Sequence, residues 1–242
     1  MVYQEITCCE TILFSRETVL KKVYFEDYRF SEDMDFTLLN DDLGDEKMEA
    51  SFEEVFDFVT EETAMEFRLE RPKHNFFDTY TFYIEYVASL GGNFHAARRI
   101  KVDITRHEQM EHEVEERAVY RDYSDIKHTE FTVKCYPLVE VLIEKMAAVM
   151  GRSQPRDLYD LWLLLEEKSF DILDHWFAFE SKARNKKVQA ENFTEVVLGK
   201  EQTFKKRWET SLQHQVKDLP GYNDVFRELS RHLRKVDKFL KK

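Results

Sequence analysis

The sequence predicts an α+β protein, in which a mixed sheet with flanking helices is followed by an all-helical C-terminal domain. Several segments of the first half alternate apolar and polar residues, which is the period of a strand. Another segment of the first half repeats apolar residues every three to four positions, which is the period of a helix. The segments after about residue 130 have the same helical period. We therefore expect a sheet-containing domain over residues 1–130 and a helical domain over residues 131–242.

The composition agrees with a folded protein that needs no disulfide support. The chain has 242 residues, of which 43% are hydrophobic, with twenty Phe and eleven Tyr, enough for a large core. No run of about eighteen apolar residues occurs, and the N-terminal residues lack a basic start and a small-residue cleavage site. We therefore expect a cytoplasmic protein with no membrane partner, whose cysteines Cys8, Cys9 and Cys135 are reduced thiols.

The elements of the first half follow from local pattern. The stretch YRFSEDMDFTLL (28–39) predicts a strand. Residues 46–62 are expected to form a helix, because they contain apolar residues such as Phe52 and Phe56 at helical spacing. A strand near residues 65–70 follows. The segments DTYTFYIEYVASL and ARRIKVDIT then alternate around Gly91-Gly92-Asn93, which predicts a β-hairpin.

After the segment FTVKCYP the pattern is helical only. Apolar residues at helical spacing between positions 138 and 149 predict one helix, which ends at Gly151. A second helix begins at Pro155, because proline is favoured in the first helical turn. Helical periodicity recurs in DILDHWFAFESKA, EQTFKKRWETSLQHQV and YNDVFRELSRHLRKVDKFL.

Two aspartates on one strand are the first candidate site. Asp33 and Asp35 project from the same strand face about 7 Å apart, while Met34, Phe36 and Leu38 point into the core. Paired carboxylates repel unless a cation is shared between them. Mg²⁺ accepts such hard oxygen ligands, but the same D-x-D spacing also arises on any solvated strand face.

A third acid strengthens the metal interpretation. In RRIKVDIT the residues Lys101, Asp103 and Thr105 alternate with the apolar core positions and are expected on an exposed face. If this strand lies beside the first, Asp103 joins Asp33 and Asp35 on one surface. Three carboxylates from adjacent strands are what a two-metal nucleotidyl-transfer site requires.

A second set of charged residues lies on the two helices after residue 137. Glu140 and Glu144 share one face and Lys145 follows, while Asp157 and Asp160 share a face of the next helix. Arg152 and Arg156 lie in or near the short link. These residues form either ordinary surface ion pairs or a cluster in which Lys145 and an arginine neutralise a triphosphate.

Other motifs are excluded by spacing. His107 and His112 are five residues apart, so they do not form the H-E-x-x-H zinc motif. No G-x-G-x-x-G, G-K-[ST] or G-x-S-x-G sequence occurs.

Charge is uneven along the chain, although the net charge is −12. Residues 181–242 contain sixteen Lys and Arg against eight Asp and Glu. This basic segment is either the solvated face of amphipathic helices or a surface for nucleic-acid phosphates.

Three stretches together resemble the AbiEii-type nucleotidyltransferase toxins of bacterial abortive-infection and toxin–antitoxin systems. They are YRFSEDMDFTLL, RRIKVDIT and YPLVEVLIEKMAAVMGRSQPRDLYDLWLLL. The resemblance implies a polymerase-β-like nucleotidyltransferase domain followed by a helical domain. It also implies transfer of a nucleotide from an NTP to RNA, in some members the 3′ end of tRNA, and a nearby antitoxin that represses transcription.

The resemblance also assigns roles to residues of this sequence. It implies that Asp33, Asp35 and Asp103 bind Mg²⁺, that Lys145 contacts the nucleotide and that Asp157 is a further catalytic acid. We expect the nucleotide to be bound by Thr18, Lys145, Arg156 and Asp160.

The sequence departs from the family pattern before the first helix. Family members have a Gly-Gly-Thr or Gly-Gly-Ser turn here, whereas this chain has Ser15-Arg16-Glu17-Thr18. Glycine lets the backbone amides approach a triphosphate, and Glu17 would repel one. Relatives also commonly carry a helical segment before this strand. The alternative expectation is therefore a catalytically impaired or truncated protein that acts as an RNA-binding or regulatory module.

Overall fold

The computed structural model describes residues 12–31, 33–39, 43–70, 79–87, 98–120 and 132–242. The predicted turn at Gly91-Gly92-Asn93 and the cysteines Cys8 and Cys9 lie outside these ranges. The chain forms two compact units. The first contains residues 1–27, 31–108 and 114–136, and the second contains residues 28–30, 109–113 and 137–242.

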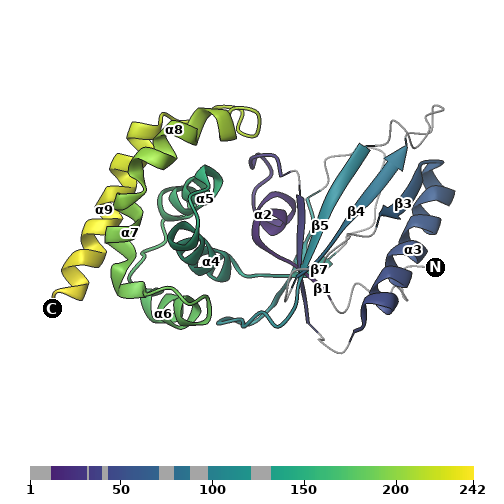
Figure 1. Cartoon of the computed structure of the whole chain (residues 1–242), viewed down its shortest axis with the longest axis horizontal. Coiled ribbons are helices and arrows are strands. Elements are labelled where there is room, and N and C mark those ends of the chain that lie inside the picture. Colours follow the sequence, from purple (N-terminus) through teal and green to yellow (C-terminus); the bar gives the residue numbers. More distant parts are fainter. Residues whose placement is uncertain (1–11, 32, 40–42, 71–78, 88–97, 121–131) are drawn as a thin grey trace. The chain divides into compact units, whose positions relative to one another are not determined.

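The first unit is built on a seven-stranded mixed sheet (Figure 1). Its strand order is β3-β4-β5-β2-β1-β7-β6. Two neighbouring pairs, β2–β5 and β1–β7, are parallel, and the other pairs are antiparallel. The strands are β1 (Ile12–Phe14), β2 (Asp33–Leu38), β3 (Glu66–Glu70), β4 (Thr79–Val87), β5 (Arg98–Thr105), β6 (Glu115–Ala118) and β7 (Thr132–Cys135). The α+β prediction, the antiparallel β4–β5 pair and the adjacency of β2 and β5 are thereby confirmed.

Helix α3 (Asp45–Thr63) covers one face of this sheet (Figure 1). Its apolar residues Met48, Phe52 and Phe56 pack into one core with Phe36 and Phe82 of the strands. The Phe52 and Phe82 rings meet edge to face with centroids 4.8 Å apart. Burying each such ring contributes roughly 1.5–3 kcal/mol, so the apolar strand positions are fixed toward α3.

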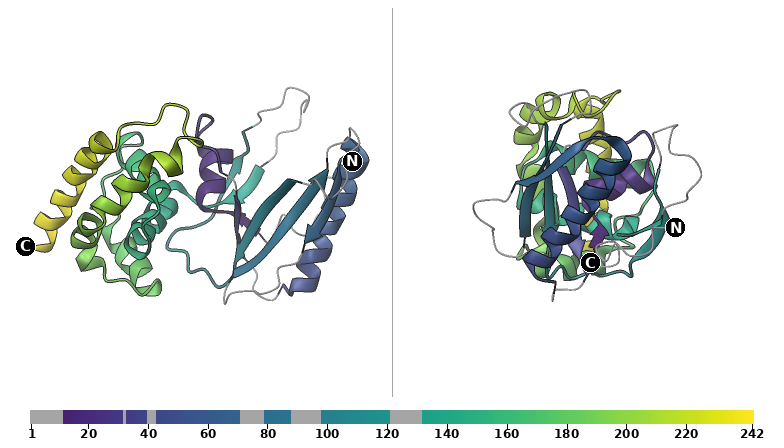
Figure 2. Two further views of the ribbon diagram at one scale, coloured as in Figure 1. Left: turned by 45° about the horizontal axis from the view of Figure 1, so that its top comes forward. Right: turned by 90° about the vertical axis from the view of Figure 1, so that its right-hand side faces the viewer.

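Helix α2 (Arg16–Val19), extended by the π-helical turn η1 (Leu20–Tyr24), lies on the opposite face (Figures 1 and 2). Asp35 and Thr105 were expected on an exposed face, and this expectation is wrong, because both are buried where α2 packs on the sheet. The neighbouring Thr37 is also buried, and its Oγ1 forms a hydrogen bond of 2.8 Å with the Tyr136 hydroxyl. The alternation identified the core face but gave no information about what covers the other.

Cys135 ends β7 as a buried free thiol, and we predict that it resists alkylation. Burial, assisted by the negative charge of Glu115, raises the pKa of the Cys135 thiol to about 11. The thiolate is the reactive form, so iodoacetamide at pH 8 should modify Cys135 about a hundredfold more slowly than an unperturbed thiol. Peptide mass spectrometry measures this rate, with the same cysteine in urea as the control. Equal rates in native and denatured protein would contradict the prediction.

The second unit is helical over residues 138–240, apart from the connecting turns. The helices are α4 (Leu138–Gly151), α5 (Pro155–Glu166), α6 (Trp176–Asn185), η3 (Ala190–Asn192), α7 (Phe193–Gly199), α8 (Glu201–Leu212) and α9 (Tyr222–Leu240). The predicted helix boundaries at Gly151 and Pro155 are confirmed. Trp176, Phe179 and Phe193 form edge-to-face ring contacts in its core.

Within the described residues, no helix combines the length and the hydropathy that a membrane span requires.

Candidate functional site

The predicted acidic residues lie on the α2-facing side of the two central parallel strands. In the β2–β5 ladder Asp35 is directly opposite Asp103, and Asp33 is opposite Lys101. Neighbouring strands are about 4.8 Å apart, and residues two positions apart project from the same face. The sheet therefore brings Asp33, Asp35 and Asp103 to one surface, as the sequence predicted.

Asp103 is held by hydrogen bonds within the sheet. Thr81 of β4 donates to its Oδ1 at 2.6 Å, and the Lys101 amine donates to its Oδ2 at 2.5 Å. Burial disfavours the charged amine of Lys101, but the hydrogen bond and charge of Asp103, together with the charge of Asp33, outweigh it and raise the pKa of Lys101. The carboxylate of Asp103 thus has a permanent cation beside it.

The turn between β1 and α2 is fastened to the backbone of Asp35. The Ser15 N–H donates to the Asp35 carbonyl at 3.2 Å, and the Asp35 N–H donates to Thr18 Oγ1 at 2.7 Å. Ser15 is extended, whereas Arg16 has a φ of 50°, a left-handed conformation that glycine adopts more readily than any other residue. The turn therefore contains a conformation suited to glycine at a position where this chain has arginine.

The arginine side chain of this turn reaches the acidic surface. Arg16 Nη1 lies 3.5 Å from Asp35 Oδ1, and its Nη2 donates to Thr105 Oγ1 at 3.4 Å. Glu17, expected to repel phosphate, is buried in α2. Thr18 is also buried, and its hydroxyl contacts the Asp35 backbone.

The donors on this surface fit Mg²⁺ in chemical type. Carboxylate oxygens from adjacent strands, with threonine hydroxyls beside them, are the hard ligands that this ion prefers. In the described part of the chain the carboxylates of Asp33, Asp35 and Asp103 do not converge to within 4.8 Å of one another. Two of these carboxylates instead contact the side chains of Arg16 and Lys101.

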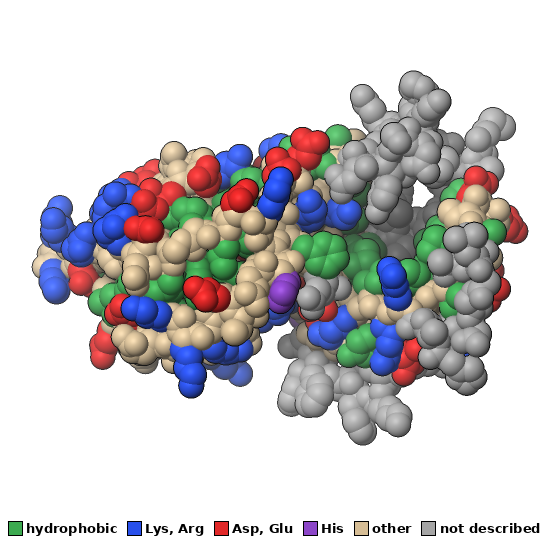
Figure 3. All heavy atoms as spheres, turned by 90° about the horizontal axis from the view of Figure 1, so that it is seen from above, with side chains coloured by type: hydrophobic (Ala, Val, Ile, Leu, Met, Phe, Trp, Pro, Cys, Tyr) green, Lys and Arg blue, Asp and Glu red, His purple; other side chains and the backbone are tan. Residues whose placement is uncertain are grey.

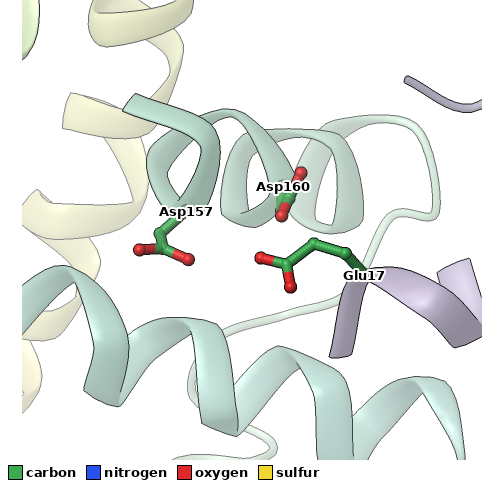
Figure 4. Close-up of side chains that lie close together, drawn as sticks. All are labelled: Glu17, Asp157 and Asp160. Atoms are coloured by element: carbon green, nitrogen blue, oxygen red, sulfur yellow. The ribbon is translucent and has the colours of Figure 1, made fainter. Parts of the chain in front are cut away.

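In the helical unit, Lys145 is buried between the two predicted aspartates. Asp157 and Asp160 project from α5 (Figure 4), and the Lys145 amine lies 3.1 Å from Asp157 Oδ1 and 2.7 Å from Asp160 Oδ2. The side chain of Lys145 is 2% exposed, and those of both aspartates are 0% exposed. These residues are therefore not surface ion pairs, which was one of the two expectations for them.

Two arginines complete this cluster: Arg29, whose side chain is 1% exposed, and Arg152, whose side chain is 47% exposed. Arg29 contacts both Asp160 oxygens at 2.8 Å, and Arg152 contacts both Asp157 oxygens at 2.6 and 2.9 Å. The Tyr28 hydroxyl also donates to Asp160. Such bidentate arginine–carboxylate pairs are strong and geometrically specific.

Sequence reasoning missed Tyr28 and Arg29. They precede the D-x-D strand by a few residues, yet both belong to the helical unit. In the stretch YRFSEDMDFTLL, Arg29 stands between the aromatic residues Tyr28 and Phe30. This local pattern does not identify Asp160 as the partner of Arg29.

The remaining predicted residue, Arg156, is half-buried on α5. Among the described residues its Nε has no hydrogen-bond partner. Its predicted contact with nucleotide, like the predicted nucleotide contacts of Lys145 and Asp160 and the catalytic role of Asp157, stays a prediction.

Glu140 and Glu144 share a face of α4, as predicted, and both bind a residue that the sequence did not reveal. The Lys182 amine of α6 lies 2.8 Å from Glu140 and 2.9 Å from Glu144, and its side chain is completely buried. His112 joins the same group, because its Nδ1 lies 3.0 Å from Glu140 Oε2. This group holds α4, α6 and residues 109–113 together.

Basic side chains of the helical unit gather at one end of the surface shown in Figure 3, interspersed with acidic ones. On α9, Arg231 pairs with Glu166 and Lys235 with Asp171, and all of these side chains keep contact with solvent. Both cations therefore stay at the surface although they are ion-paired, and a polyanion could contact them there.

The mixed sheet with facing carboxylates on β2 and β5, preceded by the β1–α2 turn, defines a nucleotidyltransferase-like α+β protein. The family model described as "Nucleotidyl transferase AbiEii toxin, Type IV TA system" matches residues 18–241. The chain therefore belongs to this family of nucleotidyltransferase toxins from type IV toxin–antitoxin systems, which implies a nucleotide substrate and an antitoxin partner.

Among solved structures, the chain is similar to MenT4, a nucleotidyltransferase toxin from Mycobacterium tuberculosis H37Rv. The identity is 16%, the match covers 96% of this chain and 84% of that one, and the TM-score is 0.46. A comparison with curated proteins gave no match.

Proposed function

We propose that the protein is a Mg²⁺-dependent nucleotidyltransferase toxin that transfers a nucleotide from an NTP to an RNA acceptor, with tRNA as the acceptor class. The observation that carries this proposal is the placement of Asp35 directly opposite Asp103, with Asp33 on the same face. Membership of the nucleotidyltransferase family supports the reaction class.

In the proposed reaction an RNA hydroxyl attacks the α-phosphorus of the NTP. The new oxygen–phosphorus bond forms as the bond to the bridging oxygen breaks, pyrophosphate leaves with the bonding electrons, and the proton of the attacking hydroxyl passes to solvent water. Asp33, Asp35 and Asp103 would hold Mg²⁺, which supplies charge neutralisation and a more acidic attacking hydroxyl. The β1–α2 turn fixes the Asp35 backbone through Ser15 and Thr18, so that its carboxylate is positioned before substrate binds.

The nucleotide and the RNA would be bound by further residues of the chain. We propose that Thr18, Lys145, Arg156 and Asp160 act in nucleotide binding and that Asp157 is a further acid of the site. The solvent-contacting cations of α9 support binding of RNA, because neutralising phosphates supplies most of the affinity for nucleic acid. An antitoxin encoded nearby, acting in a phage-defence system, is the proposed partner.

A second candidate is supported by one observation. The guanidinium of Arg16 contacts Asp35, where the reaction needs a metal ligand. A protein whose acidic surface is permanently neutralised in this way would keep the fold and act as an RNA-binding or regulatory module without transfer.

Transfer to RNA distinguishes the two candidates. Purified full-length protein, total RNA, Mg²⁺ and each of the four NTPs labelled at the α-phosphate should give labelled RNA of tRNA size. EDTA should abolish the label, and γ-labelled NTP should give none because that phosphate leaves in pyrophosphate. No labelling with any of the four NTPs would reject the enzyme and favour the binding module.

A further inference from the structure

We propose that Arg16 is a resident cation of the acidic surface, which pairs with Asp35 in the free protein and weakens the binding of a divalent cation there. The inference rests on the proposed function, because the competing ion is the one that nucleotidyl transfer needs. It concerns a property of this chain's own turn, in which an arginine has a φ of 50°.

The backbone shows that Arg16 is held in place at a conformational cost. Its φ of 50° lies in the left-handed region, where a residue with a Cβ is disfavoured and glycine is not. Hydrogen bonds from Ser15 and to Thr18 fix the turn on the two backbone groups of Asp35. A left-handed non-glycine residue held by its surroundings is often part of a functional site.

The side chain then spans the two strands that carry the acids. Its two terminal nitrogens lie 3.5 Å from Asp35 Oδ1 and 3.4 Å from Thr105 Oγ1, and Thr105 lies two residues after Asp103 on β5. Both distances are longer than a strong charged hydrogen bond, so the pairing is mainly electrostatic. The side chains are 29% and 11% exposed for Arg16 and Asp35, which limits screening by water.

Two carboxylates of this face contact cations of the protein itself. The Lys101 amine lies 2.5 Å from Asp103 Oδ2, and Arg16 Nη1 lies 3.5 Å from Asp35 Oδ1. A divalent cation that binds Asp35 must displace Arg16 or accept its repulsion. One opposite charge at this distance changes the affinity of a carboxylate for a competing cation by about tenfold or more.

Binding of Mn²⁺ to the full-length protein, followed by electron paramagnetic resonance with Mg²⁺ as competitor, tests the proposal without reference to activity. Carboxylate sites that suit Mg²⁺ also suit Mn²⁺. Arg16→Gln removes the charge and keeps the side-chain size, and Arg16→Gly also relieves the left-handed strain. Both should bind Mn²⁺ about tenfold or more tightly than the unmodified protein, whereas Arg16→Lys should match the unmodified protein.

Two controls make the result specific. Arg98→Gln changes an exposed arginine at the start of the same strand β5 and should alter Mn²⁺ affinity less than about twofold, because exposed charges are well screened. Asp35→Asn in the Arg16→Gln background should remove the gain. Circular dichroism confirms that each variant is folded.

The outcomes separate this inference from the proposed function. If Arg16→Gln and Arg16→Gly bind Mn²⁺ no more tightly than the unmodified protein, while Asp35→Asn abolishes binding, the resident-cation role is overturned and the metal site stands. If no variant with Asp35 intact binds Mn²⁺, both the inference and the proposed metal-dependent function are overturned.

Discussion

Asp35→Asn should reduce nucleotide transfer to RNA by about a thousandfold or more. The substitution keeps the shape of the side chain but removes the charge that faces Asp103 across the central strands. The backbone bonds from Ser15 and to Thr18 do not depend on that charge. The side chain of Arg16 is 29% exposed, so water can solvate its guanidinium when the Asp35 charge is removed, and the variant should remain folded.

The measurement is the initial rate of labelling from α-labelled NTP at saturating Mg²⁺. The matched control is Asp224→Asn, which makes the same change at an exposed ion pair with Arg227 on α9 and should leave the rate within about twofold. Labelling by Asp35→Asn within threefold of the unmodified protein would show that this carboxylate does not take part in transfer.

Lys145→Met should lower the free energy of unfolding of the helical unit by about 3–5 kcal/mol, because it removes one partner from a buried ion cluster. Asp157 and Asp160 would each keep one arginine but lose the cation that they share. Methionine fills a similar volume, so the loss is electrostatic rather than a cavity effect.

Denaturant unfolding followed by tryptophan fluorescence measures this loss in the correct part of the molecule. The three tryptophans of the chain, Trp162, Trp176 and Trp208, all lie in the helical unit. Lys235→Met, at a half-exposed pair with Asp171, is the control and should cost about 0–1 kcal/mol. A loss below about 1 kcal/mol in Lys145→Met would contradict the structural role.

The stability effect also changes how nucleotide-binding experiments on Lys145 are interpreted. A variant that partly unfolds loses affinity whether or not the lysine contacts the nucleotide. Loss of NTP binding therefore supports the predicted contact only when the variant is folded under the conditions of the titration.

The strand alternation was sufficient to predict which face of β2 and of β5 carries the acidic residues. Because Phe36, Val102 and Ile104 are apolar, they fix which face of β2 and β5 packs against α3, and Asp35 and Asp103 must then project from the other. Their adjacency required β2 and β5 to be neighbours, which the sequence suggested only through the resemblance of the three stretches.

The sequence could not predict the partners of these residues, because the partners are distant along the chain. Arg29 binds a carboxylate 131 residues away, and Lys182 binds Glu140 and Glu144 from another helix. The hydrophobic periodicity within a segment gives no information about ion pairs between residues so far apart in the sequence. The burial of Asp35 and Thr105 similarly depends on α2, whose helical turn is too short to produce a recognisable amphipathic pattern.

Residues 28–30 and 109–113 belong to the helical unit, although both segments are flanked in the sequence by residues of the sheet-containing unit. The polypeptide passes between its two units five times, so no single cut yields both of them intact. A fragment beginning at Pro137 would lack Arg29, which binds Asp160. It would also lack His112, which contacts Glu140, and Gln109, whose carbonyl accepts a hydrogen bond from Lys182. Recombination at one junction would therefore take Arg29 from the buried Asp160 and leave it with Lys145 as a remaining cation, and the two units are expected to be exchanged among relatives only together.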